Sequence, residues 1–138
     1  MAAGLAVTAR DTASAFAVVT AHRADDAASG PDGMREVLAT VAHAHTLVVL
    51  MGAARLDAVA STLVALGRSA DTPAAVVERG TLPDQRTTWG TLGTIAALAA
   101  TAAVRAPATL IVGGVVALGR DAVAGVVDAA HGPVAASC

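Results

Sequence analysis

The chain has 138 residues, of which 55% are hydrophobic and 14% charged, and its formal net charge at pH 7 is −2. This length suffices for one domain with its own core, and the weak negative charge argues against a basic surface for nucleic acid. The mean hydropathy is +0.64, but the longest charge-free stretches are broken by His, Gly and Thr before they reach the roughly 20 apolar residues of a membrane span, so none is expected.

The first half of the chain is predicted to contain a strand and a helix separated by a loop. The apolar run FAVVT, residues 16–20, predicts a strand. Residues 21–33 are polar and contain Gly and Pro, which is typical of a loop, and residues 36–41 predict a short helix.

The central part of the chain has the pattern of a strand–helix–strand unit. The apolar run from residue 47 to 51 ends at Gly52, as expected of a strand buried on both faces. Residues 56–66 carry leucine and valine at helical spacing, and Gly67 stands where a helix would end in a left-handed residue. Residues 74–78 predict the second strand, and such a crossover normally joins parallel strands.

The last part of the chain is predicted to contain one more helix and one more strand. Thr91 is expected to cap a helix whose inner face holds Leu92, Ile95, Leu98 and Ala102. Residues 108–112 predict a strand that ends at a Gly-Gly pair. Residues 121–138 have weak periodicity and are expected to form either a final strand or a frayed, flexible tail. The predicted fold is therefore α/β, with a mostly parallel or mixed sheet flanked by helices.

Two strand ends are candidates for a ligand site, because ligands bind at the carboxyl ends of parallel strands in such sheets. Met51 follows one strand and the Arg79-Gly80-Thr81 run follows the other, in strands expected to be neighbours. Glycine permits positive φ and close approach of a ligand, and methionine offers a soft contact. The alternative, that these glycines only shape turns and Met51 is core, is favoured on spacing alone. Arg10 is equally compatible with a surface charge and a carboxylate contact.

Metal and redox sites are not expected. The single cysteine is the last residue, Cys138, which leaves no disulfide framework and no cysteine metal site. His43 and His45 lie two residues apart, and no HExxH or Cys/His spacing occurs. The first residues lack the basic start and long apolar run of a signal peptide, so a cytoplasmic protein is the default expectation.

Several segments match a known enzyme family in the same order and at the same spacing. Three segments resemble the C-terminal half of the uroporphyrinogen-III C-methyltransferases: LVVLMG, DTPAAVVERGTLPDQRTTWGTLGTI and PATLIVGGVV. These enzymes belong to the S-adenosyl-L-methionine (SAM)-dependent tetrapyrrole methylases. AGLAVTARDTASAFAVVTAH resembles that family's AGIPVTHRGxAxSFxxVTGH segment. The resemblance covers residues 3–118. It implies that residues 1–138 are the C-terminal part of the tetrapyrrole methylase fold, without the N-terminal half.

The resemblance also implies residue roles. Met51 matches the methionine of the family's LMG run, and Gly80 and Thr81 match its E-x-G-T turn, which implies that all three are SAM-binding positions. Arg10 matches the arginine of T-H-R, which is expected near the tetrapyrrole carboxylates, since a guanidinium pairs bidentately with them. The catalytic residues are unknown and are expected in the absent N-terminal half.

Other matched positions concern the shape of the site. Gln85 and Arg86 fit the family's G-T-x-x-x-Q-R pattern and are expected to hold the cofactor turn, whereas Trp89 has no matched role and is expected to pack on the sheet. Departures from the family pattern concentrate on the substrate side, at Ala9, Asp11, Ala15, Ala21 and Gly114.

The function implied by this resemblance is SAM-dependent C-methylation of uroporphyrinogen III to precorrin-2, in siroheme and cobalamin biosynthesis. Methyl transfer depends on alignment and exclusion of water more than on a side-chain nucleophile, and no nucleophile motif occurs. The expected partners are the tetrapyrrole and a second copy or a missing N-terminal half, and the chain alone is expected to be inactive. Two alternatives remain: another corrin-pathway methyltransferase, or a non-catalytic half-domain acting in dimerisation or partner binding.

Overall fold

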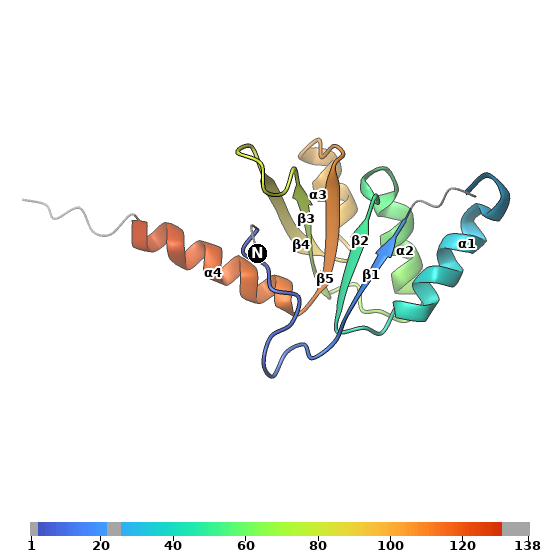
Figure 1. The fold of residues 1–138 in the computed structure, drawn as a ribbon, viewed down its shortest axis with the longest axis horizontal. Helices are drawn as coiled ribbons and strands as arrows, with labels where there is room; N and C mark the ends of the chain where they lie inside the picture. The colour runs from blue at the N-terminus through green and yellow to red at the C-terminus, as the bar shows by residue number, and fades with distance from the viewer. Residues whose placement is uncertain (1–2, 22–25, 131–138) are drawn as a thin grey trace, which may run out of the picture.

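The computed structural model describes residues 3–21 and 26–130, which form a five-stranded sheet with helices on both faces (Figure 1). The strands are β1 (Phe16–Thr20), β2 (Thr46–Leu50), β3 (Pro73–Glu78), β4 (Arg86–Thr91) and β5 (Ala108–Gly113). The helices are α1 (Asp26–Val41), α2 (Leu56–Ala65), α3 (Ile95–Thr101) and α4 (Val115–Ala130), with a short 3-10 helix (Ala53–Arg55) before α2. Within these described ranges, no helix has both the length and the apolarity required to cross a membrane.

The sheet is mixed, with strand order β1-β2-β5-β3-β4. β1 and β2 are parallel, whereas the pairings of β2 with β5, β5 with β3 and β3 with β4 are antiparallel. The α/β class with a mixed sheet flanked by helices is confirmed. The expectation of a mainly parallel sheet, with β2 and β3 as neighbours, is wrong. β2 and β3 run in the same direction, but β5 lies between them, and β4 returns beside β3 as a hairpin.

Helix α1 is longer than the predicted helix over residues 36–41. α1 begins at Asp26, so residues 26–33 are helical and the predicted loop over 21–33 is wrong there. Leu38 and Ala42 are buried in the core, and Met34 packs against it. Packing of this apolar face outweighs the low helix propensity of the preceding Gly and Pro, since tertiary contacts supply most helical stability.

The ends of α2 and α3 differ in how well they were predicted. Gly67 follows α2 with φ +99°, and the Arg68 N–H donates to the Leu63 carbonyl at 3.0 Å, which confirms the left-handed helix end. The predicted cap of α3 is wrong: Thr91 is the last residue of β4, and Thr94 precedes the helix. The strand continues to Thr91 because that residue pairs with Pro73 of β3.

Residues 121–130 continue α4, so the predicted final strand is wrong for them, while residues 131–138 lie outside the described residues. Figure 1 shows α4 extending away from the sheet with the N-terminal segment beside it. The first turns of α4 pack on the sheet through Val116, and Leu5 packs so closely on Gly119 that a Cβ there would overlap it. The helix therefore covers the sheet only near its own start.

Side-chain alternation along the strands divides the core between two faces. Leu47 and Val49 point into the larger cluster, which α1, α2 and α3 cover. The smaller cluster on the opposite face consists of Leu5, Ala75, Val77, Ile111 and Val116. Trp89 packs against that second cluster, which confirms its predicted role on the sheet surface.

Candidate functional site

Two of the predicted ligand-binding segments lie at one edge of the sheet, on either side of the start of β5. Val49 pairs with Leu110 and Glu78 pairs with Ala108, so β2 and β3 both end where β5 begins. A pocket of about 720 Å³ opens where β2 ends and β5 begins, and its walls include Leu50, Met51, Ala53, Pro107 and Thr109. The carboxyl end of β2 and the start of β5 therefore frame a largely apolar hollow, and β3 ends at the same edge of the sheet.

Met51 lines this pocket and is 61% exposed. The interpretation of Met51 as a core residue is therefore wrong. Its backbone has φ +54°, in the left-handed region that non-glycine residues seldom adopt. An exposed, polarisable thioether beside an apolar hollow can contact a planar or sulfur-containing ligand.

The turn after β3 has the same unusual backbone. Arg79 has φ +52° and Thr81 has φ +72°, whereas the positive-φ glycines of the described residues are Gly4, Gly67 and Gly113. Gly80, which lies between these two residues, does not itself have a positive φ. Left-handed non-glycine residues cost of order 1–3 kcal/mol each and tend to cluster at functional sites. Gly80 has ordinary room for a Cβ, 3.5 Å from Val77 Cγ1, so the fold itself does not require glycine there.

Side chains hold this turn in shape, as predicted for Gln85 and Arg86. The Gln85 Oε1 atom accepts the Thr81 N–H at 2.8 Å, and the Arg86 guanidinium contacts Glu78 at 2.7 Å. Asp84 contacts the Arg79 guanidinium at 2.6 Å. The hydrogen bond from Arg79 is the main reason why the pKa of the Asp84 carboxyl lies below its usual value.

Sequence reasoning missed the contributions of Glu78 and Pro107. Glu78 is only 5% exposed, yet it is charged and sits at the last position of an apolar strand. That combination was the available signal, because buried carboxylates are rare unless paired. Pro107 lines the pocket, and its carbonyl accepts the Arg79 N–H at 2.9 Å. No local pattern shows that the loop before β5 reaches the turn after β3.

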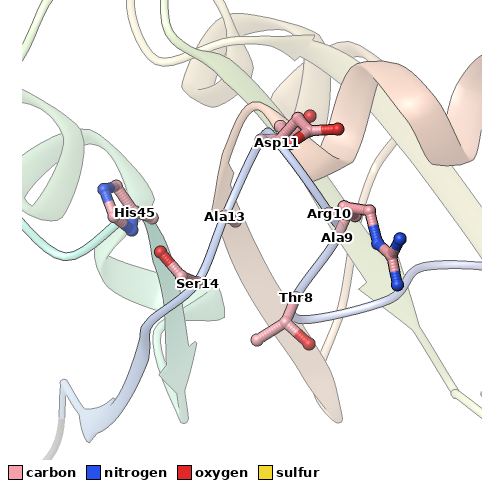
Figure 2. Close-up of a pocket in the computed structure, with 8 residues that line it drawn as sticks. Thr8, Ala9, Arg10, Asp11, Ala13, Ser14 and His45 are labelled. Atoms are coloured by element: carbon pink, nitrogen blue, oxygen red, sulfur yellow. The ribbon is translucent and has the colours of Figure 1, made fainter.

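Arg10 lies at the opposite edge of the sheet. It occupies a turn closed by mutual Ala9–Ala13 backbone hydrogen bonds of 2.9 Å, just before β1 begins. This turn borders a second pocket of about 690 Å³, which His45 also lines immediately before β2. Figure 2 shows the Ser14 hydroxyl directed toward His45, with Arg10 on the other arm of the turn. The structure therefore brings together Met51 and the Gly80 turn but not Arg10.

The described residues contain no group of three or more His, Cys, Asp or Glu side chains arranged to hold a metal ion. His43 and His45 are both exposed. The other two histidines, His22 and His131, lie outside the described residues.

The chain is similar in sequence to known proteins. Residues 1–96 match the family model described as Tetrapyrrole (Corrin/Porphyrin) Methylases. The chain is 43% identical over 116 residues to the siroheme synthase of Stutzerimonas stutzeri, covering 84% of this chain and 24% of that protein. It is 44% identical over 117 residues to an S-adenosyl-L-methionine-dependent uroporphyrinogen III methyltransferase of Methanosarcina barkeri, covering 84% of this chain and 44% of that protein. The chain thus spans less than half the length of these two relatives.

Solved structures share the fold. Uroporphyrin-III C-methyltransferase from Thermus thermophilus, complexed with S-adenosyl homocysteine, aligns with a TM-score of 0.71 and 36% identity. The alignment covers 85% of this chain and 49% of that one. Cobalt precorrin-4 methyltransferase aligns with a TM-score of 0.67 at 19% identity, which shows a common fold alone.

Proposed function

The chain belongs to the tetrapyrrole (corrin/porphyrin) methylase family, and we propose that its strand-end pocket forms part of the donor site of a SAM-dependent methyltransferase. The acceptor in this proposal is uroporphyrinogen III, methylated on carbon to precorrin-2. Another tetrapyrrole of the corrin pathway is the alternative acceptor. The observation that carries the proposal is the exposed Met51 side chain beside the apolar pocket, on the sheet edge that also holds the Gly80 turn.

The residues at this edge fit such a donor. Leu50 and Pro107 offer apolar walls to a planar adenine, and the Met51 thioether offers a soft contact near a sulfur centre. Gly80 carries no side chain that would keep a ligand away from the backbone of the turn. When bound, the donor supplies an electrophilic methyl group. The residues of this chain bind and orient it and shield it from water, which is where methyl transfer gains most of its rate.

The relatives limit how much of the reaction we assign to this chain. The Methanosarcina barkeri methyltransferase matches over 44% of its own length. We therefore propose that this chain supplies one part of the donor site and shows no turnover alone. Incubation with SAM and uroporphyrinogen III should yield no methylated product by mass spectrometry. A product at the rate of a complete enzyme would contradict this part of the proposal.

Association with a second copy, or with a separate segment that completes the site, is part of the proposal. Phe16 and Val18 on β1, one of the two outer strands, are 51% and 52% exposed, and Leu50 on β2, opposite Thr20, is 40% exposed. Apolar side chains exposed on an outer strand favour contact with another chain. Analytical ultracentrifugation should show a concentration-dependent dimer, and Val18→Lys should weaken it.

Isothermal titration calorimetry with S-adenosyl homocysteine tests donor binding. We expect the wild-type chain to bind and Gly80→Val to lose at least tenfold in affinity, because a branched side chain would block the approach to the turn. Gly125→Val is the matched control. Gly125 lies on α4, and nothing stands within 4 Å of its Cβ position. Equal affinity of the wild type and Gly80→Val would refute the role of this edge.

A further inference from the structure

The carboxylate of Glu78 joins two segments that are far apart in the sequence. Its Oε2 atom contacts the Arg86 guanidinium at 2.7 Å, at the start of β4. Its Oε1 atom accepts the Arg105 N–H at 3.0 Å, in the loop that leads into β5. The Glu78 side chain is 6% exposed, whereas that of Arg86 is 59% exposed. Both oxygens of a buried acid are therefore satisfied by donors from two separate segments, the start of β4 and the loop before β5.

A second hydrogen bond continues this link along the chain. The Arg79 N–H donates to the Pro107 carbonyl at 2.9 Å. Glu78, the last residue of β3, and Arg79, the first residue after it, thereby hold Arg105 and Pro107. Pro107 is a wall of the strand-end pocket, and Arg79 begins the turn that carries Gly80. The position of the pocket wall relative to this turn thus depends on contacts at the end of β3.

We propose that Glu78 is a positioning residue for the donor site, and that its carboxylate sets the placement of the Arg105–Pro107 wall against the Arg79–Thr81 turn. A carboxylate suits this role because it only accepts hydrogen bonds, and both of its partners are donors. A glutamine of the same size would present an N–H₂ group to one of them. The effect on ligand affinity rests on the proposed function, whereas the effect on the backbone does not.

Amide hydrogen exchange tests the positioning role directly on the chain without any ligand. In Glu78→Gln, we expect the Arg105 and Arg79 amides to exchange at least tenfold faster than in the wild type. The Val49 amide, on β2 between β1 and β5, should change less than twofold and shows that the fold is kept. Glu78→Ala should have the larger effect, because it removes both acceptors. Wild-type exchange of Arg79 and Arg105 in folded Glu78→Gln would overturn the proposal.

Asp121→Asn is the matched control, since Asp121 is an acid that also contacts an arginine side chain but lies on α4, with its own side chain 72% exposed. It should leave exchange of the Arg79 and Arg105 amides within twofold of the wild type. An Asp121→Asn effect as large as that of Glu78→Gln would overturn the proposal, because loss of any carboxylate charge would then loosen the wall.

Affinity for S-adenosyl homocysteine then separates the two proposals. We expect Glu78→Gln to bind at least tenfold more weakly than the wild type, and Asp121→Asn within twofold. If the wild type itself does not bind, the proposed function fails while the exchange data still decide the role of Glu78. If the wild type and Glu78→Gln bind equally, the donor site stands and Glu78 does not position it.

Discussion

Arg79 and Asp84 form an ion pair across the turn that joins β3 to β4, with 2.6 Å between Arg79 Nε and Asp84 Oδ2. Both side chains are well exposed, at 46% and 61%, so solvent screens their attraction. The pair nevertheless links the two ends of the segment that holds Gly80 and Thr81, at the strand-end site.

This ion pair predicts a pH-dependent contribution to stability. The hydrogen bond from Arg79 lowers the folded-state pKa of Asp84 below its ordinary value of 3.8. A lowered pKa means that the stabilisation is complete above the unfolded-state pKa and is lost as pH falls through the folded-state pKa. Thermal melts should show Asp84→Asn slightly less stable than the wild type at neutral pH. The difference should vanish below the folded-state pKa, and one that persists there would contradict this origin.

A pair of opposite substitutions at two helix ends tests left-handed backbone strain. Gly67 after α2 has φ +99°, with nothing within 4 Å of its Cβ position, and Ala103 after α3 has φ +52°. Gly67→Ala should lower the free energy of unfolding by about 1–2 kcal/mol through conformation alone. Ala103→Gly should raise it by about 0.5–1 kcal/mol. Chemical denaturation measures both, and changes of the same sign would refute the explanation.

Gly113 at the end of β5 is expected to be the most sensitive glycine in the sheet. A Cβ there would overlap the His45 carbonyl oxygen and lie 3.2 Å from Thr46 Cα, at a φ of +144°. Because both neighbours are backbone atoms of β2 and its approach, they cannot move aside cheaply. Gly113→Ala should cost about 3 kcal/mol or more. Gly125→Ala on exposed α4 is the control and should gain about 0.5–1 kcal/mol.

Gly80→Ala should separate a role in folding from a role in binding. The added Cβ meets Val77 Cγ1 at 3.5 Å and Gln85 Oε1 at 3.9 Å, which are ordinary contacts. The free energy of unfolding should therefore change by less than about 1 kcal/mol. Affinity for S-adenosyl homocysteine should fall severalfold if a ligand lies against the turn. A stable variant with unchanged affinity would show that the ligand does not approach Gly80.

Local pattern predicted much of the secondary structure. β1 is predicted to the residue, and β2, β3 and β5 to within one residue at each end, because each is an apolar run bounded by polar or glycine residues. α2 and its end at Gly67 follow from helical spacing and a glycine. The start of α1 and the whole of α4 were not predicted, because their sequences are rich in residues that local rules assign to loops or leave undecided. Their helical state depends on packing against the sheet.

Residue patterns alone predicted the α/β class and most strand positions, and they carried the resemblance that identified Met51, Gly80 and Thr81 as site candidates. Three features emerged only once the chain was folded: β5 lies between β2 and β3, Arg10 lies at the opposite edge, and Glu78 reaches Arg105. This difference arises because local residue preferences act over a few positions. Strand order and the partner of a buried carboxylate depend instead on contacts between segments that are distant in the chain.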